Sequence, residues 1–404
     1  MSAPREPARE TYDAEIRFDG RPGREVVRAY VKMTYATRTG ACRPGPALPL
    51  RHPLLDEKKR PTLIPGTDYW PAKSWTDVAV IGAACAPGGR PVERMRVAVG
   101  VGTRTKQIDV LGRRVVTWHA GQPVFSASEP FVEMPLSYDN AYGGVDARVE
   151  PGLVSEGQLV KWATGLDHPG AYPRNPFGKG YVVAREPCDG MELPNLEMPQ
   201  DPLTPACLVV GDPALWHRQP VPWCFDWLHA RMFPRSLFYL RTSGPWFPPP
   251  EDEAYAERHW GVVSQDYLDW RDSSDAGDPL GAHPRFYQEA SIGLCFSRIG
   301  PGTPIKLQGV HPEGRTVEFA LPPPPSLEVI SEGTIQTLAP RLNNVECLPA
   351  DDLVTLTYVA EIAPPRTFIP GIHREIDLKL SVEHDRPIPY VTPPTVLDIT
   401  GIKL

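Results

Sequence analysis

The sequence predicts a mainly β protein, with antiparallel sheets in a sandwich- or barrel-like arrangement, long Pro/Gly-rich loops and a few short helices. Proline accounts for 50 of the 404 residues, more than twice its ordinary share of roughly 5%. Each proline fixes φ and removes a backbone donor, which disfavours long helices. Several segments alternate apolar and polar residues at the period of a strand. An apolar content of 41%, with ten tryptophans and fourteen tyrosines, is sufficient for a packed core.

The clearest strand patterns lie in the first 120 residues. Residues 24–38 (REVVRAYVKMTYATR) alternate and predict a half-buried strand. Residues 76–87 (TDVAVIGAACAP) form a more continuously apolar run, and residues 93–116 alternate again around Gly100 and Gly102. We expect antiparallel β-structure throughout this part of the chain.

Regular periodicity is lost between residues 122 and 250, where Gly, Pro and Asn dominate. These residues favour turns and coil. Short helices are expected at 154–165 (VSEGQLVKWATG) and 224–233 (CFDWLHARMF), and a longer helix at 251–272, which follows three prolines and carries acids in its first turn.

The last hundred residues return to strand patterns. A hairpin is expected from GTPIKLQGVHP and RTVEFALPPPP, followed by strands in DLVTLTYVAEIAPP and EIDLKLSVEHD. The prolines at 322–325 mark a boundary. We therefore divide the chain into an N-terminal leader (1–22), a β-rich domain (23–322) and a C-terminal β extension (323–404) packed on or following it.

Charge and cysteine usage exclude several classes of partner and compartment. The net charge of −7 comes from 49 acids and 42 bases without a basic block, so no nucleic acid is expected. No run of about eighteen apolar residues predicts membrane insertion, and the polar N-terminus lacks an export signal. Seven scattered cysteines without a C-x-x-C motif predict reduced thiols and a cytoplasmic protein.

The common catalytic and cofactor motifs fail at identifiable positions. GVGTRT has Thr105 where a dinucleotide-binding loop has its third glycine, and Lys179 in FGKG is followed by Gly180 instead of Ser or Thr. No G-x-S-x-G nucleophile elbow occurs. The ten histidines form no H-x-H or H-x-x-x-H pair. We therefore expect no cofactor, no metal and no catalytic residues.

One alternative remains open, because acids gather in the Gly/Pro-rich centre. Paired carboxylates flanking a glycosidic bond could hydrolyse carbohydrate or peptidoglycan. The more ordinary interpretation is that Asp and Asn beside Gly or Pro bond nearby backbone and shape turns. The acids concerned are Asp139, Asp146, Asp189, Glu192 and Glu197.

Several blocks between residues 34 and 322 occur together in a fixed order. They are PAKSWTDVAVIGAACAPGGRPV, with Lys73, Thr76 and Asp77, then VAVGVGTRTKQIDVLGRR, MPLSYDNAYGG, NPFGKGY, LPNLE, RFYQEAS and GVHPEGRTVEFALP. In this order the blocks resemble a bacterial family, the domain of unknown function 2169, found in type VI secretion gene clusters. Tyr142 stands where the family more commonly has phenylalanine, and residues 206–281 fit the family pattern poorly.

The resemblance implies a non-enzymatic adaptor or chaperone. Its partners would be an effector toxin and the secretion spike, either the valine-glycine-repeat trimer or a PAAR-domain protein. No catalytic residues are assigned in the family. A structural accessory protein of the secretion apparatus is a further hypothesis.

Two sets of candidate site residues follow from these patterns. Glycines that allow φ > 0 or close chain approach, and polar groups that bind loop backbone, predict a loop-structuring motif: Tyr138, Tyr142, Gly143, Gly144, Asn175, Pro176, Gly178, Gly180, Pro194, Asn195 and Glu197. Aromatic residues concentrated where the family pattern weakens are candidates for partner binding, with a core role as the alternative: Trp223, Trp227, Phe233, Phe238 and Tyr239.

Overall fold

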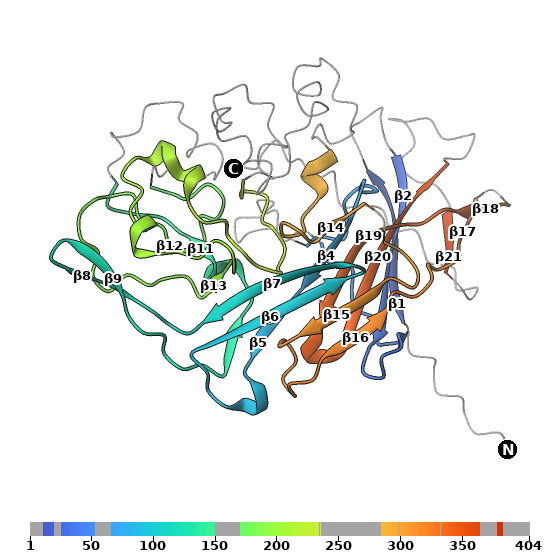
Figure 1. The fold of residues 1–404 in the computed structure, drawn as a ribbon. Coiled ribbons are helices and arrows are strands. Elements are labelled where there is room, and N and C mark those ends of the chain that lie inside the picture. Colours follow the sequence, from blue (N-terminus) through green and yellow to red (C-terminus); the bar gives the residue numbers. More distant parts are fainter. Residues whose placement is uncertain are drawn as a thin grey trace, which may run out of the picture.

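The computed structural model describes residues 11–19, 26–52, 66–149, 170–233, 235, 284–297, 299–331, 333–363 and 378–382. The predicted helices at 154–165 and 251–272, together with Phe238 and Tyr239, lie outside these ranges. Within them the chain forms strands, irregular loops and short 3-10 helices, of which the longest is η5 (Pro213–Arg218). The protein is therefore mainly β, as predicted (Figure 1).

A seven-stranded sheet combines strands from both ends of the sequence (Figure 1). Its order is β1 (Tyr12–Asp19), β2 (Val26–Ala36), β20 (Leu353–Ile362), β19 (Arg341–Leu348), β4 (Thr76–Val80) and β14 (Cys295–Phe296), and β3 (Arg43–Pro44) pairs with β2. β19 and β4 are parallel, whereas the other pairings are antiparallel. β14 is an edge strand of only two residues.

A five-stranded antiparallel sheet lies against the first. Its order is β13 (Leu196–Glu197), β7 (Arg104–Leu111), β6 (Arg94–Val101), β15 (Pro304–Gln308) and β16 (Val317–Ala320). Gly102 and Thr103 close the β6–β7 hairpin, and Gly102 has a φ of 57°, which glycine adopts without strain. β15 and β16 form the hairpin that the sequence predicts.

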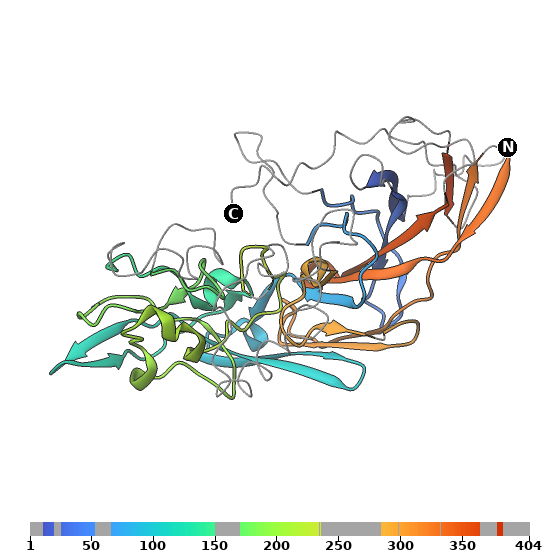
Figure 2. The same ribbon diagram turned by 90° about the horizontal axis from the view of Figure 1, so that it is seen from above.

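Smaller ladders and helical turns extend the two sheets. The ladders pair β5 (Ala83–Cys85) with β10 (Glu133–Pro135), β8 (Val116–His119) with β9 (Gln122–Phe125), β11 (Tyr142–Gly143) with β12 (Lys179–Gly180), and β17 (Leu327–Ser331) with both β18 (Thr334–Leu338) and β21 (Leu378–Val382). The other 3-10 turns are η1 (Pro87–Gly89), η2 (Tyr138–Asn140), η4 (Pro205–Cys207), η8 (Pro284–Tyr287) and η9 (Pro349–Asp351). Figure 2 shows the loops of residues 170–233 at one end of the sheets and β17, β18 and β21 at the other.

One hydrophobic core joins the facing surfaces of the two large sheets. It includes Val31, Val78, Val345 and Leu356 from the seven-stranded sheet and Val97, Val99, Ile108, Ile305 and Leu307 from the five-stranded sheet, each at most 1% exposed. A second cluster, rich in aromatic residues, lies under the loops and contains Tyr142, Tyr172, Tyr181, Trp216 and Phe233. Alternating residues of the strands thus form the first core, and aromatic residues of the loops form the second cluster.

Two sequence-based expectations require correction. β2 is buried on both faces from Val27 to Tyr35, whereas the alternation predicts a half-buried strand. Its polar face is buried because charged partners are available: Lys32 Nζ lies 2.9 Å from Asp68 Oδ2. Residues 224–233 form turns instead of a helix. Their backbone groups bond to other segments, with Val80 N–H donating to Phe225 O and Leu228 N–H to Glu289 O.

The main sheet continues across both predicted boundaries. β1 lies entirely in the segment assigned to the leader and pairs with β2. β19 and β20 lie in the assigned C-terminal extension, yet they occupy the middle of the seven-stranded sheet. Among the described residues, no helix is long and apolar enough to span a bilayer.

Candidate functional site

The glycine-rich blocks are tied together by one buried amide. Asn175 Nδ2 donates to the carbonyl oxygens of Tyr138 (2.8 Å) and Tyr142 (3.1 Å), and Asn175 Oδ1 accepts from Phe177 N–H (3.3 Å). The Asn175 carbonyl accepts from Gly144 N–H at 2.8 Å. A single side chain thus satisfies backbone groups that no sheet supplies with partners.

The neighbouring glycines permit close approach of the chains. Gly143 and Gly144 have φ values of 150° and 100°, a region that side chains disfavour. A Cβ on Gly143 would collide with the Asn175 carbonyl, and a Cβ on Gly178 would collide with Ala141 O. Gly180 (φ 95°) faces Pro194 Cδ and Pro176 is buried beside them.

Two further residues of the predicted loop-structuring motif attach these loops to the five-stranded sheet. Asn195 Nδ2 donates to Leu111 O (3.0 Å), and Leu111 N–H donates to Asn195 O (2.8 Å). Arg114 Nη2 donates to Glu197 Oε1 (2.6 Å) and to Pro194 O (2.7 Å). These contacts make the blocks a framework that holds loops on the sheet.

Buried tyrosine hydroxyls connect the same framework to more distant segments. Tyr138 OH donates to Ser291 Oγ (3.0 Å), and Tyr142 OH donates to Gln219 Oε1 (3.0 Å). Burial raises the pKa of both phenols well above the ordinary value. Both side chains therefore serve as neutral donors.

The acids proposed as paired carboxylates are mostly engaged with cations or backbone. Asp146 contacts the Arg148 guanidinium at 2.9 and 3.0 Å and accepts from three backbone N–H groups. Burial opposes ionisation of Asp146, but these donors outweigh it and lower its pKa. Glu192 binds Arg113, which lowers its pKa, and burial raises the pKa of Glu197 against the attraction of Arg114. Asp189 Oδ1 accepts from Trp118 N–H.

The candidate partner-binding aromatics lie mainly in the core. Trp227 is 3% exposed, and its Nε1 donates to Glu346 Oε2 (2.8 Å). Phe233 is 2% exposed and packs edge-on against Trp216. Trp223 is half-buried, with Nε1 bonded to Gln107 O. In this conformation Trp227 and Phe233 present no ring to a partner.

A buried ionic network positions the segment that follows η8. Lys73 Nζ lies 2.6 Å from Asp77 Oδ2 and 2.7 Å from Asn344 Oδ1, and Asp77 Oδ2 accepts from Glu289 N–H (2.7 Å). Arg235 Nη2 lies 2.7 Å from Glu289 Oε1. Lys73 and Asp77 therefore fix residues 289–296 beside β4.

Lys106 holds the same segment from the side of β7. Its Nζ donates to Ser291 Oγ and Ile292 O, both at 2.7 Å, and lies 4.1 Å from the centre of the Trp223 ring. Burial lowers the pKa of Lys106 to about 7. Three neutral groups thus surround the buried amine of Lys106, and no carboxylate among the described residues pairs with it.

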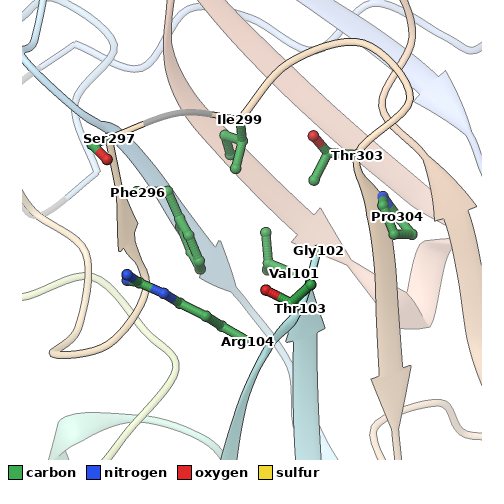
Figure 3. A pocket seen from close by; sticks show the side chains of 9 residues that line it. All are labelled: Val101, Gly102, Thr103, Arg104, Phe296, Ser297, Ile299, Thr303 and Pro304. Atoms are coloured by element: carbon green, nitrogen blue, oxygen red, sulfur yellow. The ribbon is translucent and has the colours of Figure 1, made fainter.

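A pocket opens between the β6–β7 hairpin and β14, where the two large sheets meet (Figure 3). Its volume is about 320 Å³. Arg104 extends along one side, with its guanidinium carbon 5.9 Å from the centre of the Phe296 ring. The other lining residues are apolar or carry hydroxyl groups: Val101, Gly102, Thr103, Ser297, Ile299, Thr303 and Pro304.

An exposed tryptophan precedes β4. Trp75 adjoins Thr76, which pairs with Phe296 in the β4–β14 ladder, but Trp75 does not line the pocket. Its side chain is 44% exposed, and the Arg285 guanidinium carbon lies 5.9 Å from the centre of its ring. We call the pocket lining the junction surface: Val101, Gly102, Thr103, Arg104, Phe296, Ser297, Ile299, Thr303 and Pro304.

Sequence reasoning did not identify the junction surface. GVGTRT predicts the turn that presents Arg104, but the opposite wall comes from residues far away in the sequence. Only the strand pairing brings Phe296 to Thr76. Among the described residues, no group of three His, Cys, Asp or Glu side chains is arranged to hold a metal ion.

Residues 22–359 match the family described as an uncharacterised protein conserved in bacteria (DUF2169). The chain belongs to this family. The match covers both large sheets except for β1 and the end of β20. No curated protein and no solved structure matches the chain.

Proposed function

We propose that this family member is a non-enzymatic cytoplasmic adaptor that binds a toxic effector and helps to load it onto the type VI secretion spike. The junction surface is the observation that carries the proposal. Its apolar walls, its hydroxyl groups and an exposed arginine without an ion pair among the described residues have the composition of a binding site, because aromatic and arginine side chains dominate interface energetics. The adaptor role itself follows from the motif resemblance of the family blocks.

The arginine contacts of the acids in the Gly/Pro-rich centre also favour a binding function over hydrolysis. A hydrolytic pair needs two carboxyl groups free to act on opposite sides of one bond. Asp146, Glu192 and Glu197 are each bonded to an arginine. Their hydrogen bonds are those expected of residues that fix loops.

The adaptor proposal is tested by co-expression with the neighbouring toxin and spike genes. We expect a stable complex of the chain with the toxin, and in a deletion strain a lower toxin level and reduced secretion that the intact gene restores. A strain without the gene that keeps normal toxin stability and secretion contradicts the proposal. Loss of export of every toxin would instead identify a structural accessory of the apparatus.

A hydrolase acting on carbohydrate or peptidoglycan is the second candidate, and one acid favours it. Burial raises the pKa of Asp226 to about 6, and the charges of Glu346 and Asp139 act in the same direction. A carboxyl group whose pKa burial raises toward neutrality can serve as a general acid. Asp139 is one of the acids identified from the sequence.

The test of this second candidate is turnover of cell-wall fragments. A hydrolase would lose at least about a hundredfold in rate in Asp226→Asn or Asp139→Asn, because general acid–base catalysis contributes about 10²–10⁴-fold. Glu197→Gln is the matched control, since Glu197 is held by Arg114. Absence of turnover, or turnover that survives both Asp substitutions, eliminates this candidate.

A further inference from the structure

We propose that the pocket of the junction surface binds an acidic side chain, flanked by an apolar residue, on an exposed segment of the partner protein. The inference rests on the proposed adaptor function and specifies the chemistry of its ligand. Arg104 would bind the carboxylate, the hydroxyl groups would complete its hydrogen bonding, and Phe296 with Ile299 would cover the apolar neighbour.

Charge complementarity is the first argument. Arg104 is exposed and makes no ion pair with any residue in the described part of the chain. Arg94 and Arg96, on the adjacent strand, both bind Asp109. A guanidinium presents donors in a fixed planar fork that matches a carboxylate. Arg104 therefore carries a binding capacity that the described chain leaves unused.

The hydroxyl groups supply additional donors. Thr303 Oγ1 accepts from Gly300 N–H at 3.1 Å, which leaves its own hydrogen available to a ligand. Thr103 and Ser297 line the same pocket from the hairpin turn and from the end of β14. Figure 3 shows Thr103 beside Arg104, with Thr303 and Ser297 on other sides of the pocket. An anion held there would meet donors from both sheets.

The volume limits the size of the ligand. Ligand pockets commonly measure roughly 300–1,000 Å³, and this one is at the lower end with about 320 Å³. It has room for one or two side chains and not for a helix. Val101, Phe296, Ile299 and Pro304 provide apolar contact next to Arg104. The pocket thus fits an acid with an apolar neighbour.

The proposed adaptor function favours a protein segment over a free metabolite as the source of the acid. Gly102, Thr103, Arg104 and Ser297 are all exposed, so a segment of a partner can reach the pocket from outside.

The pocket itself is rigidly supported. Lys106 and the Asp77 network fix both ends of the Ser291–Phe296 segment. The opposite wall is stabilised by Gly102 N–H, which donates to Pro304 O at 2.9 Å, and by Leu321 N–H, which donates to Thr303 O at 2.9 Å. A preformed pocket loses little conformational entropy on binding.

The test uses the full chain with ¹³C-labelled isoleucine methyl groups and two capped peptides, acetyl-Ala-Phe-Glu-Ala-amide and the same peptide with Gln in place of Glu. We expect the Glu peptide to shift the Ile299 methyl resonance saturably and to bind at least tenfold more tightly than the Gln peptide. Arg104→Gln should weaken binding of the Glu peptide at least tenfold. Arg90→Gln, at an exposed arginine outside the pocket, should leave it unchanged.

Three results would overturn the inference. They are equal affinity for the Glu and Gln peptides, unchanged affinity in Arg104→Gln, and glutarate binding as tightly as the Glu peptide, which would indicate a small-molecule site. The retained isoleucine methyl spectrum of each variant shows that it is folded.

Capture of the co-expressed toxin separates this inference from the adaptor proposal. Reduced capture by Arg104→Gln, but not by Arg90→Gln, supports both. Full capture by Arg104→Gln overturns the pocket inference and leaves the adaptor proposal standing. If the unmodified chain captures no toxin, the adaptor proposal fails, and with it the assignment of the pocket to a secretion partner.

Discussion

The segment from Glu289 to Ser297 has a buried half and an open half. In the buried half, Glu289 and Ser291 meet Arg235 and Lys106, and each cation is enclosed by the chain. In the open half, Ser297 lines the same pocket as Arg104, which comes from the same strand as Lys106 and has no internal carboxylate among the described residues. One strand thus carries a cation that the chain covers and satisfies, Lys106, and a cation that it leaves exposed, Arg104.

The largest expected effect is loss of the buried ion pair through Asp77→Asn. The substitution leaves Lys73 as an incompletely compensated buried cation, which costs about 3–5 kcal/mol. Urea unfolding monitored by tryptophan fluorescence measures the change. Glu318→Gln is the control, because Glu318 pairs with Lys306 and both side chains are more than half exposed, and we expect a loss below about 1 kcal/mol. Similar losses of unfolding free energy in the two variants would mean that burial does not determine how much an ion pair contributes to stability.

The next largest loss of stability is expected at Trp227, one of the aromatic residues that the sequence indicates as candidates for partner binding. Trp227→Ala should lower the free energy of unfolding by about 3–5 kcal/mol, because it empties a packed site and removes a donor from Glu346. Trp227→Phe retains most of the packing and should cost about 1–3 kcal/mol. The measurement is equilibrium unfolding of both variants together with toxin capture. Weakened capture with unchanged stability would restore the partner-binding interpretation.

Lys106→Met should change the pH dependence of stability. The pKa of Lys106 is about 7 in the folded chain and 10.5 in the reference state, so the unfolded chain binds more protons between these values. Stability from this group therefore rises with pH over that interval, with a limiting slope of about 1.4 kcal/mol per pH unit. Below about pH 7 both states are protonated and the slope vanishes.

The difference between unmodified and Lys106→Met chains, measured by urea unfolding from pH 6 to 10, isolates this contribution. Lys306→Met is the control, because the Lys306 side chain is 51% exposed and paired with Glu318 at the surface. We expect its curve to run parallel to that of the unmodified chain. Parallel curves for Lys106→Met as well would show that the amine is not buried in solution.

The smallest effect on stability is expected at the open half. Arg104→Gln should change the free energy of unfolding by no more than about 0.5 kcal/mol, since exposed side chains without strong contacts contribute little. Denaturant midpoints of the variant and the unmodified chain give the comparison. A loss above about 1 kcal/mol would indicate that Arg104 is structural, and the division between the two halves would then fail.

Local patterns in the sequence predict the fold class and several elements. The alternation in residues 93–116 gives β6 and β7, and the run before the prolines at 322–325 gives the β15–β16 hairpin. Both are pairings of neighbouring segments. The glycine and asparagine blocks likewise predict loops, and Gly143 and Asn175 occupy positions where backbone geometry demands those residues.

Long-range pairing is what the patterns do not predict. The 224–233 segment has helical spacing of apolar residues, but Phe225 O accepts from Val80 N–H and Leu228 N–H donates to Glu289 O, in other segments of the chain. The polar face of β2 has the alternation of an exposed surface, yet Asp68 supplies a partner for Lys32 in the interior. Arg104 meets Phe296 only because two sheets converge. Such encounters depend on tertiary structure and leave no local signal.

The central pairing of the seven-stranded sheet has a consequence for synthesis of the protein. β2 forms its longest ladder with β20, in which Val27 faces Ile362. During translation β2 emerges long before its principal neighbour, so the sheet cannot close until β20 has also been synthesised. Pairings this distant in sequence fold slowly and leave strand edges exposed meanwhile. The unpaired edge of β2 is therefore a site of possible aggregation in the nascent chain until β20 covers it.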